Sequence, residues 1–270
     1  MKKSILILIS FFLLIGIIIS CEKKETTVIT ATGNVTLSFA HYVNGSPVQM
    51  DTMIYVNAAG NHYEVDDFRY FISDVQFHKS GGTLININAC NWNYYVDNAY
   101  PSTFTWNICD KLPVGTYDSI SFRFGFSNAQ NQSNMFLNPP ESAMAWPPMM
   151  GGGYHYMQID GKYIDAGDTA LPFGTHLGIG QVIDGSDTIY VDNSFLVKLP
   201  VSGLALTTTT VPVIQIIMNI DRWYSNPYVF NFDYYGGYIM MNQDAMHKIS
   251  ANGCDVFTVG SILSKTRRSK

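Results

Sequence analysis

Apolar and polar residues alternate with a period of two along most of the chain, a pattern typical of half-buried β-strands. The clearest example is the stretch 115–126, in which every second position is apolar: Ile120, Phe122, Phe124 and Phe126. The same pattern predicts further strands at 35–40, 69–78, 83–87, 154–159, 188–199 and 211–220. Turn signals such as Asn44-Gly45 and Asp160-Gly161 separate these stretches, so we expect a series of strands joined by turns.

A single segment, Asn242–Ser250, has a clear helical pattern. Asn242 is a suitable N-cap, because its side-chain oxygen can accept a hydrogen bond from the first turn, and Gly253 is a suitable stop. Many strands and one short C-terminal helix predict an all-β fold, an antiparallel β-sandwich of the immunoglobulin-like or jelly-roll-like kind. Neither a repeat nor a linker interrupts the pattern, so residues 34–262 are predicted to form one domain.

The first 20 residues have the pattern of a lipoprotein signal peptide. Lys2 and Lys3 precede a nearly unbroken apolar run that ends directly at Cys21. A cysteine at this place predicts cleavage before Cys21 and lipidation of its side chain, and the alternative is an uncleaved anchor. Since each buried methylene adds ~0.8 kcal/mol, several acyl chains on one residue hold a protein stably at a membrane. We therefore expect a lipid-anchored protein of the outer membrane, on its periplasmic face or at the cell surface.

Polar and charged residues gather at both ends of the mature chain. Residues 21–33 are predicted to be a polar tether, and residues 263–270 a basic, disordered tail. Without Lys2 and Lys3, 14 basic residues remain against 21 acidic ones, a formal net charge of −7. Nucleic-acid-binding proteins need a basic face, so no nucleic-acid partner is expected.

Three cysteines follow Cys21, and exported proteins fold in oxidising compartments where disulfides persist. Cys90 and Cys109 flank one loop-rich stretch and are the best pair. A disulfide that closes a loop of this length stabilises a protein by ~3 kcal/mol. Cys254 would remain as an odd, buried thiol, although spacing alone does not fix the pairing.

The segment 144–157 has the most unusual composition in the chain. It holds four methionines, a tryptophan and a histidine around a double proline and a triple glycine. In the strand predicted here, His155 and Met157 would share a face, beside a loop that carries Met149 and Met150. Imidazole and thioether ligands suit copper, especially Cu(I), better than magnesium or calcium. The alternative is a packed core, since methionine fills gaps and a lone histidine beside aromatic residues is usually buried and hydrogen-bonded.

The second histidine expected at this site is His176. It lies between Gly174 and Gly178, and these glycines let the backbone present the side chain to a pocket. His41, at the end of the first predicted strand, is a weaker candidate. In such a site we expect a buried oxygen acceptor to fix each imidazole through its second ring nitrogen.

With both segments in place, the chain resembles the MbnP-like family of copper-binding proteins, in the branch common among lipoproteins of the Bacteroidetes. The resemblance covers roughly residues 34–259 and rests on the order and spacing of several motifs. These are Leu37-Ser38-Phe39-Ala40-His41, Val43-Asn44-Gly45, Tyr70-Phe71-Ile72-Ser73-Asp74-Val75, Gly115-Thr116-Tyr117, Ser121-Phe122-Arg123-Phe124-Gly125, Met144-x-Trp146, Gly153-Tyr154-His155, His176-x-Gly178, Trp223-Tyr224 and Val256-Phe257-Thr258-Val259.

The resemblance implies an extracytoplasmic, β-rich protein that binds copper. His155 and His176 would be its ligands, and Met157 and Met149 or Met150 are weaker ligand candidates.

The resemblance also implies a protein partner. In some members, a di-haem protein related to bacterial peroxidases oxidises a tryptophan to kynurenine, and Trp146 stands at the matching position. This sequence departs from the Met-x-Trp-x-Trp pattern of the family, because Pro148 replaces the second tryptophan. The departure weakens the expectation of a modified tryptophan more than that of a metal.

Together these features predict a lipid-anchored copper-binding protein for acquisition, storage or delivery, which is not an enzyme. The sequence has no CxxC, HExxH or GxSxG motif that would indicate a redox, metalloprotease or hydrolase centre. The alternative is a surface glycan-binding or adhesive β-sandwich without metal. Aromatic residues that could stack on sugars suggest it: Trp92, Trp106, Trp223 and Tyr224.

Overall fold

The alternating segments form two main β-sheets in the computed structural model, which describes residues 30–266. The signal peptide, the lipidation site Cys21 and the tether up to residue 29 lie outside the described residues. The chain from Ala31 onward is one compact unit. Within residues 30–266, no helix has the length and apolar character needed to cross a membrane.

The larger sheet is built on one long strand, β5 (His62–Lys79). Its strands follow the order β12 (Ala170–Leu177), β11 (Met157–Ile164), β5, β10 (Gly115–Phe124) and β15 (Phe195–Leu206). Three short strands also pair with β5: β4 (Tyr55–Val56), β6 (Leu84–Asn86) and β7 (Asn93–Asp97).

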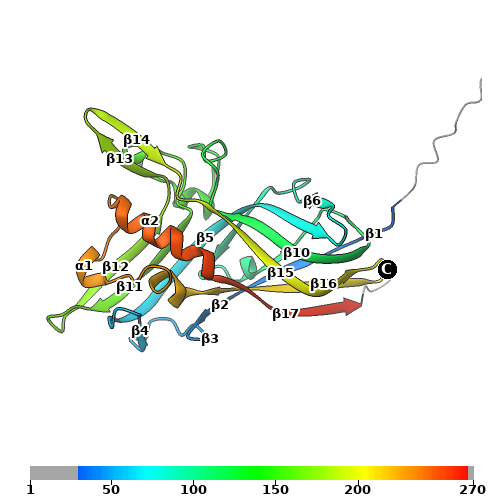
Figure 1. Ribbon diagram of the computed structural model, residues 1–270, viewed down its shortest axis with the longest axis horizontal. Helices are drawn as coiled ribbons and strands as arrows, with labels where there is room; N and C mark the ends of the chain where they lie inside the picture. The colour runs from blue at the N-terminus through cyan, green and yellow to red at the C-terminus, as the bar shows by residue number, and fades with distance from the viewer. Residues whose placement is uncertain (1–29, 267–270) are drawn as a thin grey trace, which may run out of the picture. The chain divides into compact units, whose positions relative to one another are not determined.

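The smaller sheet has the order β17 (Phe257–Thr266), β16 (Thr210–Asn219), β2 (Thr36–Val43) and β3 (Ser46–Pro47), and β8 (Thr105–Asn107) pairs with β2. Two more sheets have two strands each: β1 (Thr32–Gly33) with β9 (Leu112–Pro113), and β13 (Gly180–Asp184) with β14 (Asp187–Val191). Among the named strands of the described chain, all pairs are antiparallel except β2 with β16. This arrangement confirms the predicted all-β sandwich, and Figure 1 shows its strands.

The helical elements are short. The longest is α2 (Gln243–Asn252), and α1 (Phe232–Tyr235) is a single turn. The remaining turns are 3-10 helices: η1 (Pro101–Phe104), η2 (Glu141–Met144), η3 (Pro148–Met150), η4 (Ile220–Tyr224) and η5 (Gly253–Asp255). The predicted helix is confirmed: the side chain of Asn242 accepts a hydrogen bond from the Ala245 N–H at 3.0 Å, and Gly253 is the C-cap.

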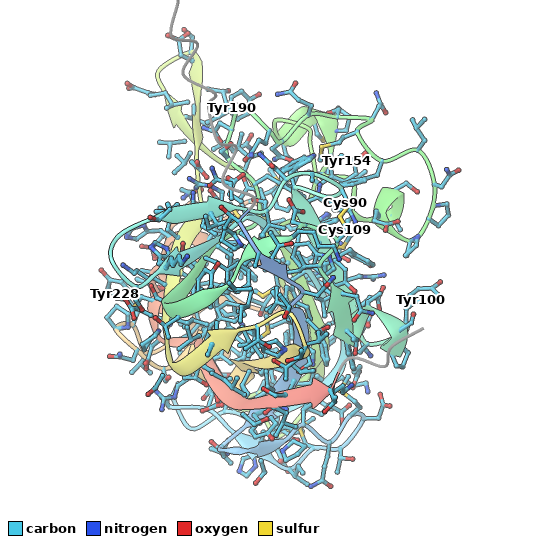
Figure 2. All side chains as sticks on the ribbon, turned by 90° about the vertical axis from the view of Figure 1, so that its right-hand side faces the viewer. Cys90, Tyr100, Cys109, Tyr154, Tyr190 and Tyr228 are labelled. Atoms are coloured by element: carbon cyan, nitrogen blue, oxygen red, sulfur yellow. A yellow bond between two sulfur atoms is a disulfide. The ribbon has the colours of Figure 1, made fainter. Side chains whose placement is uncertain are left out.

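Aromatic side chains from both sheets fill the interior. Phe257 of the smaller sheet meets Phe122 and Phe124 of the larger sheet with ring centroids 5.3 and 5.4 Å apart. Figure 2 shows the crowding of side chains between the sheets. Such close contacts across the interface hold the two layers together, because aromatic rings bury a large apolar area.

The inward-facing positions of β5 change phase twice along the strand. They are Tyr63 and Val65, then Phe68, Tyr70 and Ile72, then Val75 and Phe77. The pairing with β11 shifts register between Asp160 and Gly161, and the pairing with β10 shifts between Ser121 and Arg123. Each shift is a β-bulge, which inserts one residue and moves the following side chains to the other face.

Several predicted boundaries are wrong. The Asp160-Gly161 pair does not end a strand: β11 continues to Ile164, and the pair lies opposite the first bulge of β5. A Cβ atom on Gly161 would lie 2.1 Å from the Glu64 carbonyl oxygen, so close backbone approach explains this glycine. The predicted strand 188–199 is two strands, because β14 ends at Val191 and β15 begins at Phe195.

The ends of the domain also differ from the prediction. Strand β17 continues to Thr266, because it pairs with β16 along its whole length, so the first residues of the predicted tail are ordered. The end of the tail, 267–270, lies outside the described residues. At the other end, β1 already includes Thr32 and Gly33 of the predicted tether, since they pair with β9.

The cysteines are placed by the fold. Cys90 and Cys109 are joined in a disulfide with a Cα–Cα distance of 6.3 Å. Cys254 is exposed, contrary to the expected buried thiol. It lies in the η5 turn after α2, where its neighbours Gly253 and Val256 face the interior and Cys254 faces outward.

Candidate metal centre

His155 and His176 come together on the outer face of the larger sheet. In the antiparallel pair β11–β12, His176 is opposite Gln158, and Asp160 follows two residues along the same face. His155 precedes β11. The two imidazole rings meet edge to face, with centroids 5.3 Å apart and an interplanar angle of 83°. The structure thus brings together the two histidines that the sequence singles out.

His155 is held in one tautomer by its own loop. Its ring Nδ1 lies 2.9 Å from the Met144 carbonyl oxygen, and its backbone N–H donates to the same oxygen at 2.7 Å. A carbonyl oxygen only accepts, so Nδ1 carries the proton and Nε2 keeps its lone pair. Within the described part of the chain, Nε2 is buried and has no hydrogen-bond partner. An orphaned acceptor of this kind is costly unless something binds it.

Burial keeps His155 neutral. The side chain is 5% exposed, and desolvation lowers its pKa to about 4 against the opposing effect of the Met144 hydrogen bond. At neutral pH its free nitrogen is therefore available as a ligand rather than protonated.

His176 is fixed by a carboxylate. Its Nε2 lies 2.8 Å from Oδ1 of Asp160, at a half-buried position. A carboxylate oxygen accepts, so Nε2–H donates to Asp160 and Nδ1 is the nitrogen left free to bind a ligand. Carboxylate and carbonyl partners of this kind orient metal-binding histidines in proteins. His176 lies inside strand β12, so the sheet register, and not only the freedom of the flanking glycines, sets its position.

Trp146 covers His155 from the other side. The indole is 2% exposed, and its ring centroid lies 4.6 Å from that of His155 at an angle of 72°. Its Nε1–H donates to the Met150 carbonyl oxygen at 3.0 Å. A Cβ atom on Gly178 would lie 2.6 Å from the indole, so only glycine lets the ring lie against the β12–β13 connection.

Met149 and Met157, two of the candidate methionine ligands, lie apart from the histidine pair. Met149 is 85% exposed. Met157 is fully buried and pairs with Leu177 and Tyr70, which places it on the opposite face from His176. The prediction that His155 and Met157 share a face is therefore wrong, because regular alternation begins only at Met157. Before it, Gly151, Gly152 and Gly153 all have positive φ and bend the chain.

Gln158 is a polar neighbour that the sequence reasoning missed. It lies between His176 and Arg69 in the strand register, is 7% exposed, and has an Oε1 without a hydrogen-bond partner among the described residues. Arg69 pairs with Asp67 at 3.3 Å, and desolvation raises the pKa of Asp67. No single-sequence signal marks Gln158, because its role depends on the register between three strands.

The donor set is small. In residues 30–266 there is no group of three or more His, Cys, Asp or Glu side chains that could hold a metal ion. A closed zinc site needs four ligands, and calcium needs six or more oxygens. Two imidazoles, each with one ring nitrogen left free by its hydrogen-bond partner, instead fit a soft ion of low coordination number such as Cu(I).

Comparisons with known proteins find a matching family and a similar solved structure. A family model described as MbnP matches residues 32–244. Among solved structures, MbnP from Methylosinus trichosporium aligns with 17% sequence identity and a TM-score of 0.45, covering 68% of this chain and 76% of that chain. A search of curated proteins finds no match.

Proposed function

Because the chain belongs to the MbnP family, we propose that it is a copper-binding protein that acquires, stores or delivers Cu(I) without catalytic turnover. We further propose that lipid on Cys21 anchors it to the outer membrane, on the periplasmic face or at the cell surface. One observation carries the metal proposal: His155 and His176 are in ring contact, and each has one nitrogen fixed by an oxygen.

In this proposal His155 Nε2 and His176 Nδ1 bind the ion. The Met144 carbonyl and the Asp160 carboxylate keep both rings in the ligating tautomer, which lowers the cost of organising the site. The Gln158 Oε1 is a further candidate donor on the same face. Trp146 closes one side, while His176 and Asp160 are only half-buried. That accessible side supports exchange of the ion with a partner.

We also propose a di-haem peroxidase-like protein as a partner that oxidises Trp146. The indole is nearly fully buried, so a haem in another protein would reach it by electron transfer through intervening residues rather than by direct contact. The ring contact between Trp146 and His155 supports a link between the state of this tryptophan and the metal site.

Elemental analysis and intact mass of the mature protein, purified from its native host under mild conditions, test the function. We expect roughly stoichiometric copper that is lost in His155→Ala and His176→Ala and retained in His62→Ala, which changes an exposed histidine. The mass change of a tryptophan-to-kynurenine conversion would identify the partner's action. A protein without metal that also takes up no added Cu(I) would contradict the proposal.

A further inference from the structure

Only one of the four aromatic residues considered for sugar stacking remains available to a ligand. Trp106, Trp223 and Tyr224 are 5%, 0% and 0% exposed and belong to the core. Trp92 is half-buried and lines a cleft of about 620 Å³ on the outer face of the larger sheet, whose lining also includes Ile87 and Leu196. This volume lies within the range of ~300–1,000 Å³ that is usual for small-molecule sites.

A row of polar side chains crosses the floor of this cleft. The strand register places Asn86 of β6, Gln76 of β5, Ser121 of β10 and Lys198 of β15 side by side. Gln76 Nε2 donates to Asn86 Oδ1 at 2.9 Å, and the Ser121 hydroxyl lies 2.7 Å from His78 Nε2. These bonds fix the orientation of the amides and the hydroxyl before any ligand arrives.

An ion pair forms one end of the cleft. Arg123 Nε lies 3.6 Å from Asp74 Oδ2, and Arg123 Nη1 donates to Ser194 at 2.8 Å. Arg123 Nε is buried without a hydrogen-bond partner in the described chain. Asp74 has φ +51° and accepts from Gln130 Nε2 at 2.7 Å. Asp74 lies at the second bulge of β5, which accounts for its left-handed backbone, and its contacts with Arg123 and Gln130 hold the carboxylate at the cleft.

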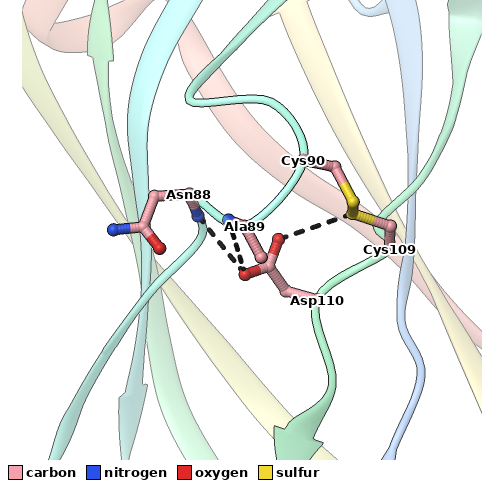
Figure 3. The surroundings of a disulfide bond; sticks show 5 residues. All are labelled: Asn88, Ala89, Cys90, Cys109 and Asp110. Atoms are coloured by element: carbon pink, nitrogen blue, oxygen red, sulfur yellow. Dashed lines mark hydrogen bonds between the residues drawn. A yellow bond between two sulfur atoms is a disulfide. The ribbon is translucent and has the colours of Figure 1, made fainter.

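The loop 88–92, which carries Trp92, is held by hydrogen bonds to Asp110 and by a disulfide to Cys109. The Asp110 carboxylate accepts from the backbone N–H groups of Asn88 and Ala89 at 3.3 and 3.0 Å, and the disulfide joins Cys90 to Cys109 (Figure 3). Asn88 and Trp92, on either side of Cys90, both line the cleft. The disulfide thus positions a stacking residue against the polar row.

We propose that this cleft is a second ligand site, independent of the copper proposal, and that it binds a short saccharide. Sugar hydroxyls both donate and accept hydrogen bonds, as do the amides of Gln76 and Asn86 and the hydroxyl of Ser121. Trp92 supplies the flat apolar surface against which the C–H face of a sugar ring packs. Arg123 and Lys198 outnumber Asp74 by one charge, so a sugar that carries a carboxylate is preferred.

The test begins with the mature chain in detergent on an array of N-acetylglucosamine oligomers, galacturonic acid oligomers and sialylated lactose. The tightest binder is then titrated calorimetrically. We expect Trp92→Ala and Gln76→Ala each to weaken sugar binding by roughly tenfold. Lys198→Ala should weaken the binding of sugars that carry a carboxylate but not that of neutral sugars. Tyr234→Ala, which removes an exposed aromatic residue on α1, should have no effect.

The outcomes separate the two proposals. Copper content should be unchanged in all of these variants, because none of the residues contacts the histidine pair. Thermal unfolding shows whether Trp92→Ala is folded. If Trp92→Ala is unfolded, the binding of Lys198→Ala tests the site instead, because Lys198 is exposed and its replacement should not disturb the fold. The absence of binding to every sugar class overturns the saccharide site, and so does binding that survives both Gln76→Ala and Lys198→Ala unchanged.

Discussion

The imidazoles of His155 and His176 meet edge to face at 5.3 Å, and the oxygen that fixes each ring comes from a different source. For His155 it is a backbone carbonyl, and for His176 it is a side-chain carboxylate. A substitution cannot remove the Met144 backbone carbonyl, whereas it can remove the Asp160 carboxylate. This asymmetry makes the contribution of the tautomer-fixing partner measurable at His176.

Replacement of either histidine by alanine should reduce Cu(I) affinity by orders of magnitude, because each supplies one of two imidazole ligands. His176→Ala should stay folded, since its side chain is partly exposed on the outer face of the sheet, whereas His155→Ala should also lower the free energy of unfolding because His155 is buried under Trp146. Competition with a chromogenic Cu(I) chelator measures the affinity, and His62→Ala is the matched control. Equal affinity in His155→Ala and wild type would refute the site.

Asp160→Ala should weaken copper binding by roughly 10- to 100-fold, the usual effect of losing a partner that orients a metal-binding histidine. Asp160→Asn keeps an acceptor oxygen for His176 Nε2–H, so it should lose less. The same chelator competition distinguishes the two variants, with the exposed Asp187→Ala as control. If Asp160→Ala binds as tightly as wild type, the carboxylate does not position His176.

Gly178→Ala should destabilise the protein by about 1–3 kcal/mol, because the new Cβ atom would overlap the Trp146 indole and force it to move. Since that indole packs on His155, tryptophan fluorescence should change together with the midpoint of urea unfolding. Gly167→Ala, in the β11–β12 turn, is the control, because only the flexible Asp165 side chain lies near its added methyl group. An unchanged unfolding midpoint in Gly178→Ala would show that the indole is not confined there.

Acid should destabilise the fold partly through His41. Desolvation lowers the pKa of His41 to about 3. The imidazole packs against the rings of Phe68 and Phe104, and its Nε2 lies 3.1 Å from the Tyr70 hydroxyl oxygen. Between about pH 6.5 and pH 3 the unfolded chain binds a proton here that the folded chain does not. The free energy of unfolding therefore falls with decreasing pH, by up to about 1.4 kcal/mol per unit from this residue.

Urea unfolding of the copper-free protein at a series of pH values measures this slope. Below pH 6, His41→Gln should reduce the pH slope of the free energy of unfolding by up to about 1.4 kcal/mol per unit. His62→Gln should leave the slope unchanged, because residue 62 is exposed. A slope identical to wild type in His41→Gln would mean that His41 is protonated in the folded state.

Removal of the disulfide in the double variant Cys90→Ala, Cys109→Ala should lower the free energy of unfolding by about 3 kcal/mol, as expected for a loop with a sequence separation of 19. Chemical denaturation measures the loss. The exposed Cys254→Ala is the control and should have little effect. Copper affinity should remain as in wild type.

Local patterns in the sequence predict much of the fold. The period-two run of Ile120, Phe122 and Phe124 marks β10, and the capping side chain of Asn242 marks α2, because both signals depend on neighbours along the chain. Within the predicted strand 69–78, the two adjacent polar residues Ser73 and Asp74 coincide with a bulge. The outer-face cleft has no such signal, since its floor is assembled from four strands.

The candidate site shows where local reasoning fails. His155 and His176 can be singled out by residue type, but their contact depends on the register of β11 and β12. The Asp160-Gly161 pair predicts a turn, but the Asp160 carboxylate is the hydrogen-bond partner of His176. Trp223 and Tyr224 illustrate the same limit, because burial of an aromatic residue depends on tertiary packing that no local pattern contains.

The two bulges of β5 divide one 18-residue strand into three segments whose inward and outward positions are set separately. Deletion of Asp74 would remove the second bulge and leave Ile72, Val75 and Phe77 in one regular alternation that still faces the core, and the pairing with β11 would be untouched. The two outer-face sites can therefore diverge independently during evolution. An engineer could likewise rebuild the saccharide cleft without disturbing the histidine pair.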